Sequence, residues 1–399
     1  MTKNSTPSIW KYLKNTHFFV FLFVFAELTK VAGFIPQIPD VVTYGIITLF
    51  ALYCIFNTQK YELIYIVLLA YIPLEILYAS PDNMFSPWIR YLLFALIIVT
   101  CTGLCASKKL VLMRARIFEI TCFCCAVLGV GSFFAFFWGL NYMLNTSIIS
   151  DFTIVGVFGG LTSHSMLLGP VAGVGTLYIA NSALRQKKWI LWALAALSLL
   201  SVLLSDSRSA FLSTISGALV LLQLSSNNSG KFFKRIIVIF ILFACTLPLW
   251  QDSASGLIEK QTGNTSAGSM FHSREDKWAQ RIEEFKSSPI FGYGFASVDK
   301  ANKDNSIGMN GETIESGSSW LSVLSMTGII GFLIIMRIYS KSVISAYKFG
   351  KDPLLISILT LLSVNMFTEG YIFFGGSFLA FLFWITIGVC SDKKYGLTR

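Results

Sequence analysis

Charged residues are scarce in this chain. They make up 13% of its 399 residues, whereas 54% of the residues are hydrophobic. An average soluble domain carries about 25% charged residues, so the composition excludes a disordered chain and an ordinary cytosolic enzyme. Because a membrane-crossing helix needs about 20 apolar residues, we expect an all-α polytopic membrane protein with a single integral membrane domain over residues 1–399.

Residues and motifs that hold metals or nucleotides are scarce as well. The three histidines, His17, His164 and His272, are too few and too scattered for a metal cage. All eight cysteines lie within or at the end of apolar segments, which argues against a disulfide framework. The sequence contains neither a P-loop nor a dinucleotide-binding fingerprint. We therefore expect no metal, no cofactor and no ATP-driven step.

We assign about twelve apolar segments to membrane spans. The first comes after a basic head and lacks a small-residue cleavage site, so we expect a span there rather than a cleaved signal peptide. The spans cover approximately residues 17–35, 41–57, 63–80, 88–106, 117–140, 166–183, 189–205, 208–225, 233–250, 319–340, 353–372 and 374–391.

Basic residues concentrate on one side of these spans. With the N-terminus inside, the inner face takes 21 of the 31 lysines and arginines and only four acids. Such a bias is typical of cytoplasmic loops, and it explains the net charge of +10 without a nucleic-acid partner. We therefore expect both termini in the cytoplasm. The longest polar segment, residues 251–318, then lies on the opposite side.

The middle of the 251–318 loop has the pattern of a helix. Ser273 and Asp276 together resemble a capping box, and Pro289 terminates the helical pattern. At 100° per residue, Arg274, Trp278 and Arg281 fall within about 60° of one another. Phe285 shares their face, which is the pattern of an interfacial helix. We expect four acids of this helix to point elsewhere: Glu275, Asp276, Glu283 and Glu284.

Three arginines on the outer side could act together. Arg208, in the short turn SDSRSAF between two spans, must lie near membrane depth, where a charge is costly and usually functional. With Arg274 and Arg281 it could clamp a pyrophosphate, because arginine binds phosphate bidentately. Two simpler interpretations stay open. Asp206 could neutralise Arg208, and the helix arginines could snorkel beside lipid headgroups.

Other membrane charges are less informative. Glu27 and Lys30 lie about one helical turn apart and are most simply an ion pair. Glu75 and Glu369 are either functional or satisfied by hydrogen bonds inside the bundle. We assign two GxxxG patterns to close helix packing: Gly156–Gly160 and Gly169–Gly173.

Four segments together resemble the O-antigen ligase and O-antigen polymerase (Wzy) superfamily. SDSRSAF is similar to its SRSA-type segment, and GGLTSHSMLLGP to its Gly-rich segment with a histidine. SREDKWAQRIEEFKSSPIFGYGF is similar to its R-x-x-x-W…P-x-x-G-x-G outer-loop signature, and ESGSSWLSVLSMTGIIG to a segment that ends in G-x-x-G. The matches run from about residue 159 to 331, whereas the first 150 residues match only in hydropathy.

The resemblance implies a GT-C-like bundle of about twelve transmembrane helices in the bacterial inner membrane, with one long periplasmic loop. It implies a metal-independent glycosyltransferase whose donor is a glycan on undecaprenyl pyrophosphate, aided by a regulator of chain length. The arginines would hold the pyrophosphate while a base on the outer loop activates an acceptor hydroxyl. The implied catalytic residues are Glu315, Arg208 and Arg281, and the implied substrate-binding residues are Arg274, Trp278, His164 and Ser207.

One position departs from the family pattern. Ligases of this family place a histidine eleven residues before the first glycine of G-x-x-G, and that position here is Gly317. Glu315 is the nearest ionisable residue, either a substitute base or a solvated loop acid. The missing histidine favours a polymerase that joins repeat units over a ligase that transfers glycan to lipid A-core. A flippase or transporter is disfavoured because the chain shows no internal repeats.

Overall fold

A computed structural model describes residues 9–36, 38–78, 86–143, 158–226, parts of 229–237, 272–298 and 317–396. The helices of these segments are α1 (Ile9–Leu28), α2 (Asp40–Phe56), α3 (Leu63–Tyr78), α4 (Pro87–Cys101), α5 (Lys108–Phe137), α6 (Ser165–Gln186), α7 (Trp189–Leu204), α8 (Arg208–Leu224), α11 (His272–Ser287), α13 (Ser319–Ser345), α14 (Pro353–Asn365) and α15 (Phe378–Asp392). A π-helix, η3 (Ala346–Gly350), extends α13, and a 3-10 turn, η4 (Lys393–Tyr395), comes after α15.

The apolar segments of the sequence are helical over most of the length that the structure describes. By length and composition, three helices within the described residues are able to cross a membrane on their own: Lys108–Phe137, Ser165–Gln186 and Ser319–Gly350. Shorter apolar helices of 10–17 residues are α2, α3, α4, α7, α8, α14 and the part of α1 over His17–Leu28. Most of the predicted ninth span, residues 233–250, lies outside the described residues.

Several helices differ in extent from the predicted spans. The fifth helix begins at Lys108, nine residues before the predicted start at 117, whereas α1 ends at Leu28, seven before 35, and α14 ends at Asn365, seven before 372. The apolar residues after α14 continue without helix because their backbone is bonded to α13. The backbone N–H of Ser319 donates to the carbonyls of Met366 and Glu369, at 2.9 and 3.0 Å. Non-helical backbone is tolerated inside a membrane protein where protein groups satisfy it.

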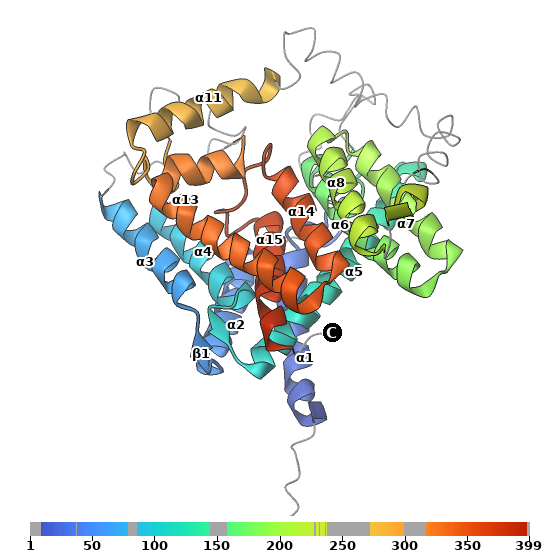
Figure 1. The fold of residues 1–399 in the computed structure, drawn as a ribbon, viewed down its shortest axis with the longest axis horizontal. Helices are drawn as coiled ribbons and strands as arrows, with labels where there is room; N and C mark the ends of the chain where they lie inside the picture. The colour runs from blue at the N-terminus through green and yellow to red at the C-terminus, as the bar shows by residue number, and fades with distance from the viewer. Residues whose placement is uncertain are drawn as a thin grey trace, which may run out of the picture.

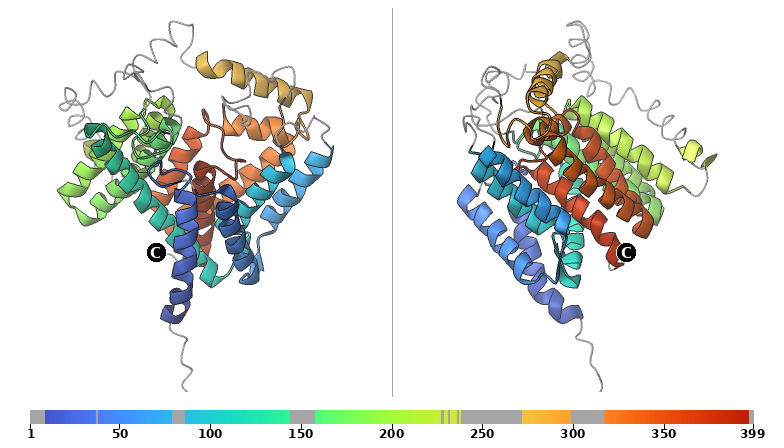
Figure 2. Two further views of the ribbon diagram at one scale, coloured as in Figure 1. Left: turned by 180° about the vertical axis from the view of Figure 1, so that it is seen from behind. Right: turned by 60° about the vertical axis from the view of Figure 1, so that its left-hand side comes forward.

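Helix α15 forms the centre of the bundle. Each of its 15 residues, from Phe378 to Asp392, is buried, as expected for a helix that is apolar on all sides. It packs against α1, α4, α5, α13 and α14 (Figure 2). Helices α6, α7 and α8 pack beside α5 and α14 and form one flank of the bundle (Figure 1).

The outer surface of the bundle exposes large apolar side chains. Examples are Phe21, Leu74, Phe123, Ile190 and Leu333, each between 52% and 66% exposed. A soluble monomer rarely leaves so many such residues in water. Helices in a bilayer gain nothing by hiding them, since lipid tails are equally apolar. This surface is that of a membrane protein.

Helix α11 lies across one end of the bundle, over α13 (Figure 1). The start of α1 and the C-terminal end of the chain lie away from that end (Figures 1 and 2). A short antiparallel pair, β1 (Lys60–Tyr61) with β2 (Cys105–Ala106), joins the turn before α3 to the turn before α5.

Buried ion pairs hold the end of the bundle where α15 terminates. Arg114 is 1% exposed and binds Asp392 through two bonds of 2.7 and 3.0 Å. Glu62 pairs with both Lys341 and Lys394. Lys341 and Lys394 are 44% and 25% exposed, so the fully buried pair is Arg114 with Asp392. Losing one partner of a buried pair costs about 3–5 kcal/mol, so this pair fastens the last helix to the first half of the chain.

Candidate functional site

The SDSRSA segment forms a tight turn between α7 and α8. The turn is possible because Asp206 adopts a left-handed conformation with φ 52°. The Ser207 hydroxyl then accepts a hydrogen bond from the backbone N–H of Ala210 at 3.3 Å and caps α8. The structure therefore gives Ser207, a predicted substrate contact, a local role as a helix cap. Arg208 is the first residue of α8.

The Gly-rich segment packs directly against this turn. A side chain on Gly169 of α6 would overlap Ala210 and approach Ser207, so glycine is what lets the two segments touch. His164, the second predicted contact in this region, is exposed and caps α6. Its Nδ1 accepts a hydrogen bond from the backbone N–H of Met166 at 3.1 Å.

The end of α1 joins the same region. The backbone N–H of Gly33 donates to the carbonyl of Leu161, and that of Ser163 to the carbonyl of Val31, both at 2.9 Å. The predicted ion pair of α1 is confirmed, with Lys30 Nζ 2.9 Å from Glu27 Oε1. The Gly-rich segment is thus bonded on one side to α1 and packed on the other against the SDSRSA turn.

The predicted helix of the outer loop is present as α11. It begins at His272, one residue before the expected cap, so that Ser273 lies in its first turn. Its aromatic residue Trp278 is partly buried and donates a hydrogen bond from Nε1 to the carbonyl of Gly317 at 3.1 Å. This bond ties the helix to the residues that lead into α13.

Arg208 and Arg274 come together beside Glu369. Arg274 Nη2 lies 2.9 Å from Glu369 Oε1, and these two side chains are 17% and 18% exposed. Arg274 is also close enough to Arg208 for their positive charges to repel each other. The structure therefore brings two of the three predicted arginines into one group. It also pairs Glu369, which the sequence left open, with one of them.

Arg281 does not join this group. It is 2% exposed, and its Nη1 lies 2.8 Å from Oε2 of Glu284. The prediction that Glu284 points away from the arginine face is wrong, because residues three apart are neighbours on a helix and Glu284 lies at the edge of the buried face. Gln280 completes the group by donating to Glu284 at 3.2 Å.

Burial also sets the electrostatics of this arginine. Desolvation lowers the pKa of Arg281, and the charge of Glu284 opposes that shift. Its second terminal nitrogen, Nη2, is buried and makes no hydrogen bond to any residue in the described part of the chain. With its guanidinium held inside the protein, Arg281 does not reach out to solvent in the way that snorkelling requires.

Two glycine motifs of the sequence meet where α11 ends. Helix α13 is interrupted at Gly328, whose φ and ψ are 60° and −168°. The P-x-x-G-x-G segment bonds to the carbonyls exposed there, with the N–H of Tyr293 2.7 Å from the carbonyl oxygen of Ser325. At Gly292, φ is 88° and a side chain would overlap the carbonyl of Met326. Only glycine permits this backbone-to-backbone contact.

Helix α3 contributes two polar side chains beneath this contact. The hydroxyl of Tyr71 donates to the carbonyl of Thr327 at 2.8 Å. Glu75 is 3% exposed, and its carboxyl group lies beside the backbone of Phe295. The sequence singled out Glu75 but not Tyr71, because a tyrosine in an apolar helix gives no signal of a contact 256 residues away.

The predicted base, Glu315, lies outside the described residues, as does Glu312. Gly317, the position of the expected histidine, has a φ of 67°. A Cβ there would lie 2.8 Å from Cβ of Lys277 on α11. Among the side chains that the structure describes, no group of three histidines, cysteines or acids is arranged to hold a metal ion.

Residues 193–336 match the family model of the O-antigen ligases. No curated protein matches the chain. The matched region contains the SDSRSA turn, α11 with its glycine segment, and the interruption of α13, and the Gly-rich segment before α6 precedes it. These segments gather at one end of an apolar helical bundle, and the match over residues 193–336 supports the resemblance of this chain to the O-antigen ligase and polymerase superfamily.

Proposed function

We propose that this protein is a polysaccharide polymerase that joins oligosaccharide repeat units carried on undecaprenyl pyrophosphate. The observation that carries the proposal is the approach of Arg208 to Arg274, which also binds Glu369. Two guanidinium groups that gather at one place favour an anionic ligand. A pyrophosphate carries the complementary charge, and the planar guanidinium binds its oxygens bidentately.

The proposed glycosyl transfer depends on the positive charges of Arg208 and Arg274. A hydroxyl oxygen of the acceptor sugar attacks the anomeric carbon of the donor, and the bond from that carbon to the pyrophosphate oxygen breaks. The lipid pyrophosphate leaves with the bonding electrons, and Arg208 and Arg274 stabilise its developing charge. The proton of the hydroxyl passes to a base, for which Glu315 is our candidate. Because the leaving group is already activated, the step needs no nucleotide sugar.

The contacts of α11 support a revised role for Arg281. Its guanidinium is committed to Glu284 and buried against the protein, so we assign it to positioning α11 rather than to contact with the substrate. Trp278 has the same role through its bond to Gly317. Arg274, on the same helix, is then held where it faces Arg208.

The surroundings of Gly317 favour a polymerase over a ligase. A side chain at this position would crowd Lys277, and the positive φ disfavours any residue with a Cβ. The histidine that ligases of the family use could not be placed here without moving α11. The alternative, a ligase that transfers glycan to lipid A-core, would need a different base.

Reconstitution separates the candidate functions. The purified protein is placed in liposomes with lipid-pyrophosphate repeat units, with and without lipid A-core, and the products are separated by size. We expect a ladder of polymer in the absence of core. Product that forms only with core would identify a ligase. Movement of the donor across the bilayer without any product would identify a flippase.

A further inference from the structure

The interruption of α13 at Gly328 leaves backbone groups that a continuous helix would have paired. The loop segment, residues 289–298 directly after α11, pairs with them in both directions. Its Pro289 carbonyl accepts from the backbone N–H of Ile329 at 2.9 Å. The backbone N–H of Gly294 donates to the carbonyl of Met326 at 3.2 Å. The loop segment therefore completes the hydrogen bonding of α13 at its interruption.

A side chain of α3 contacts both partners of this junction. The hydroxyl of Tyr71 donates to the carbonyl of Thr327 in α13 at 2.8 Å, and it lies 3.3 Å from the carbonyl oxygen of Phe291 in the loop segment. A carbonyl that loses its partner inside an apolar bundle costs about 1–3 kcal/mol. One hydroxyl thus links α3 to α13 and to the loop segment.

The same face of α3 contacts the loop segment at two further points. Glu75 and Tyr78 lie one and two turns after Tyr71. The Glu75 carboxyl, on a residue that is 3% exposed, lies beside the backbone of Phe295. The ring of Tyr78 lies 5.4 Å from that of Phe291. A carboxyl group is costly inside a membrane helix and usually has a function, and here the group beside it is the backbone of the loop segment.

We propose that Tyr71 and Glu75 are positioning residues that hold the loop segment in place and thereby orient α11. They act through this helix and not by contact with the substrate. Helix α11 carries Arg274, so the last step of the inference, from the position of α11 to glycosyl transfer, rests on the proposed function. Because α3 precedes the region 193–336 that matches the family model, the first half of the chain would then contribute to the site.

Four substitutions separate positioning from packing. A buried polar residue can often be replaced by an apolar one of similar size without loss of stability, so Glu75→Leu should stay folded in SDS titration. It removes the polar contact, whereas Glu75→Gln keeps a hydrogen-bonding group of the same shape. Tyr71→Phe removes one hydroxyl. Its matched control is Tyr91→Phe, because the hydroxyl of Tyr91 bonds at 2.8 Å to the carbonyl of Leu69 in α3 and not to the junction.

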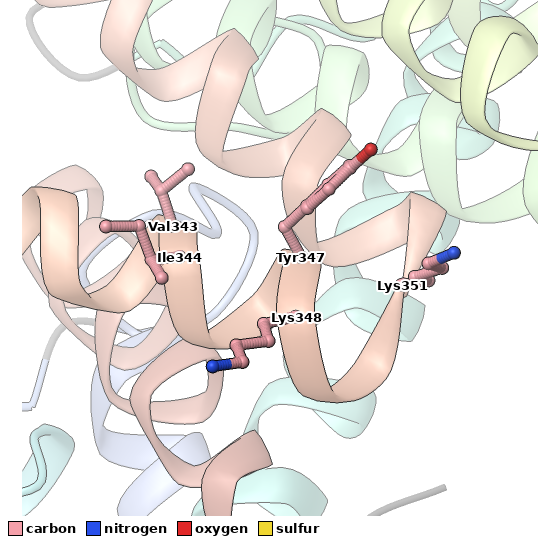
Figure 3. A pocket seen from close by; sticks show the side chains of 5 residues that line it. All are labelled: Val343, Ile344, Tyr347, Lys348 and Lys351. Atoms are coloured by element: carbon pink, nitrogen blue, oxygen red, sulfur yellow. The ribbon is translucent and has the colours of Figure 1, made fainter.

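The position of α11 is measured by electron–electron double resonance in liposomes, between spin labels at Glu283→Cys and Lys348→Cys in a background without native cysteines. Glu283 is exposed on α11. Lys348 projects from η3, at the opposite end of α13 from α11 (Figures 1 and 3). This readout is independent of enzymatic activity, and polymer formation is assayed in parallel on the unlabelled variants.

We expect Glu75→Leu and Tyr71→Phe to broaden or shift the distance distribution, and Glu75→Gln and Tyr91→Phe to match the wild type. Polymer formation by Glu75→Leu should fall by up to about 10²-fold, the effect of a misplacement of about 1 Å. Unchanged distances in Glu75→Leu and Tyr71→Phe would overturn the proposal, as would equal effects of the leucine and glutamine substitutions. Changed distances in a protein whose wild type forms no polymer would support the positioning role and reject the proposed function instead.

Discussion

Arg208 and Arg274 are the residues on which the proposed chemistry depends most directly. Their charges repel each other in the unliganded protein, and Glu369 is paired with Arg274. A bound pyrophosphate would remove this repulsion. Replacing one arginine with a neutral residue therefore has opposite effects on stability and on binding. It removes the repulsion in the unliganded protein, but it weakens the binding of the donor.

We expect Arg208→Ala and Arg274→Ala each to lower polymer formation by about 10²–10³-fold, the range for losing one donor to a developing charge. The protein should remain folded in both. Arg208→Lys and Arg274→Lys should rescue poorly, because an ammonium group cannot form the two-pronged contact. Polymer assays with donor titration measure this, and Arg116→Ala, at an exposed pair with Glu119, is the control. Full activity in both lysine variants would rule out the clamp.

Glu315 is the residue expected to receive the proton. Glu315→Gln keeps the shape of the side chain but not its basicity, so we expect transfer to slow by roughly 10²–10⁴-fold while donor binding is nearly unchanged. Single-turnover kinetics separate the two. Glu312→Gln, three residues away, should behave as wild type. If the effects of the two substitutions are reversed, the base is not Glu315.

Helix α11 is the element that places Arg274 close to Arg208. Arg281 and Glu284 form a buried ion pair within this helix, on the face that it buries, and removing one partner of such a buried pair costs about 3–5 kcal/mol. We expect Arg281→Ala to lower the free energy of unfolding by this amount in SDS titration. Arg281→Met combined with Glu284→Gln leaves no buried charge and keeps an acceptor for Gln280, so most of the stability should return.

Activity in this double variant tests the role of Arg281. If Arg281 only positions α11, the stable double variant should form polymer within about tenfold of wild type, since the arginine clamp is intact. A double variant that is stable but makes no polymer would show that Arg281 contacts the donor, as the sequence alone suggested.

The sequence predicted the existence of α11 and the face that carries Arg274, Trp278, Arg281 and Phe285, which are buried or partly buried, because helical periodicity is a local property. It did not predict the pairing of Arg274 with Glu369, which lies 95 residues further along the chain. It placed Glu284 on the wrong face because a helical wheel assigns angles but not the width of the buried surface. It also extended α14 too far, since an apolar segment can be buried without being helical.

At the scale of the whole molecule, the outer and inner faces are assigned by charge alone. Single cysteines should test this assignment, because the described native cysteines are buried, apart from the partly buried Cys124. We expect a membrane-impermeant thiol reagent added from the periplasm to label Glu283→Cys on α11, where the side chain is 66% exposed. It should leave Lys348→Cys unlabelled until the membrane is opened. Labelling of position 348 from the periplasm would contradict the predicted twelve-span topology.

The main-chain contact between Gly292 and Gly328 has a consequence for how this enzyme can diversify. The segment 289–294, directly after α11, is bonded to α13 through main-chain atoms, which every sequence shares, with glycines at the closest points. We therefore expect that exposed side chains between 275 and 287 can be replaced without changing the position of Arg274. We expect chimaeras that exchange these exposed residues to accept new sugars while keeping the same catalytic frame, so that sugar specificity can evolve separately from the chemistry of transfer.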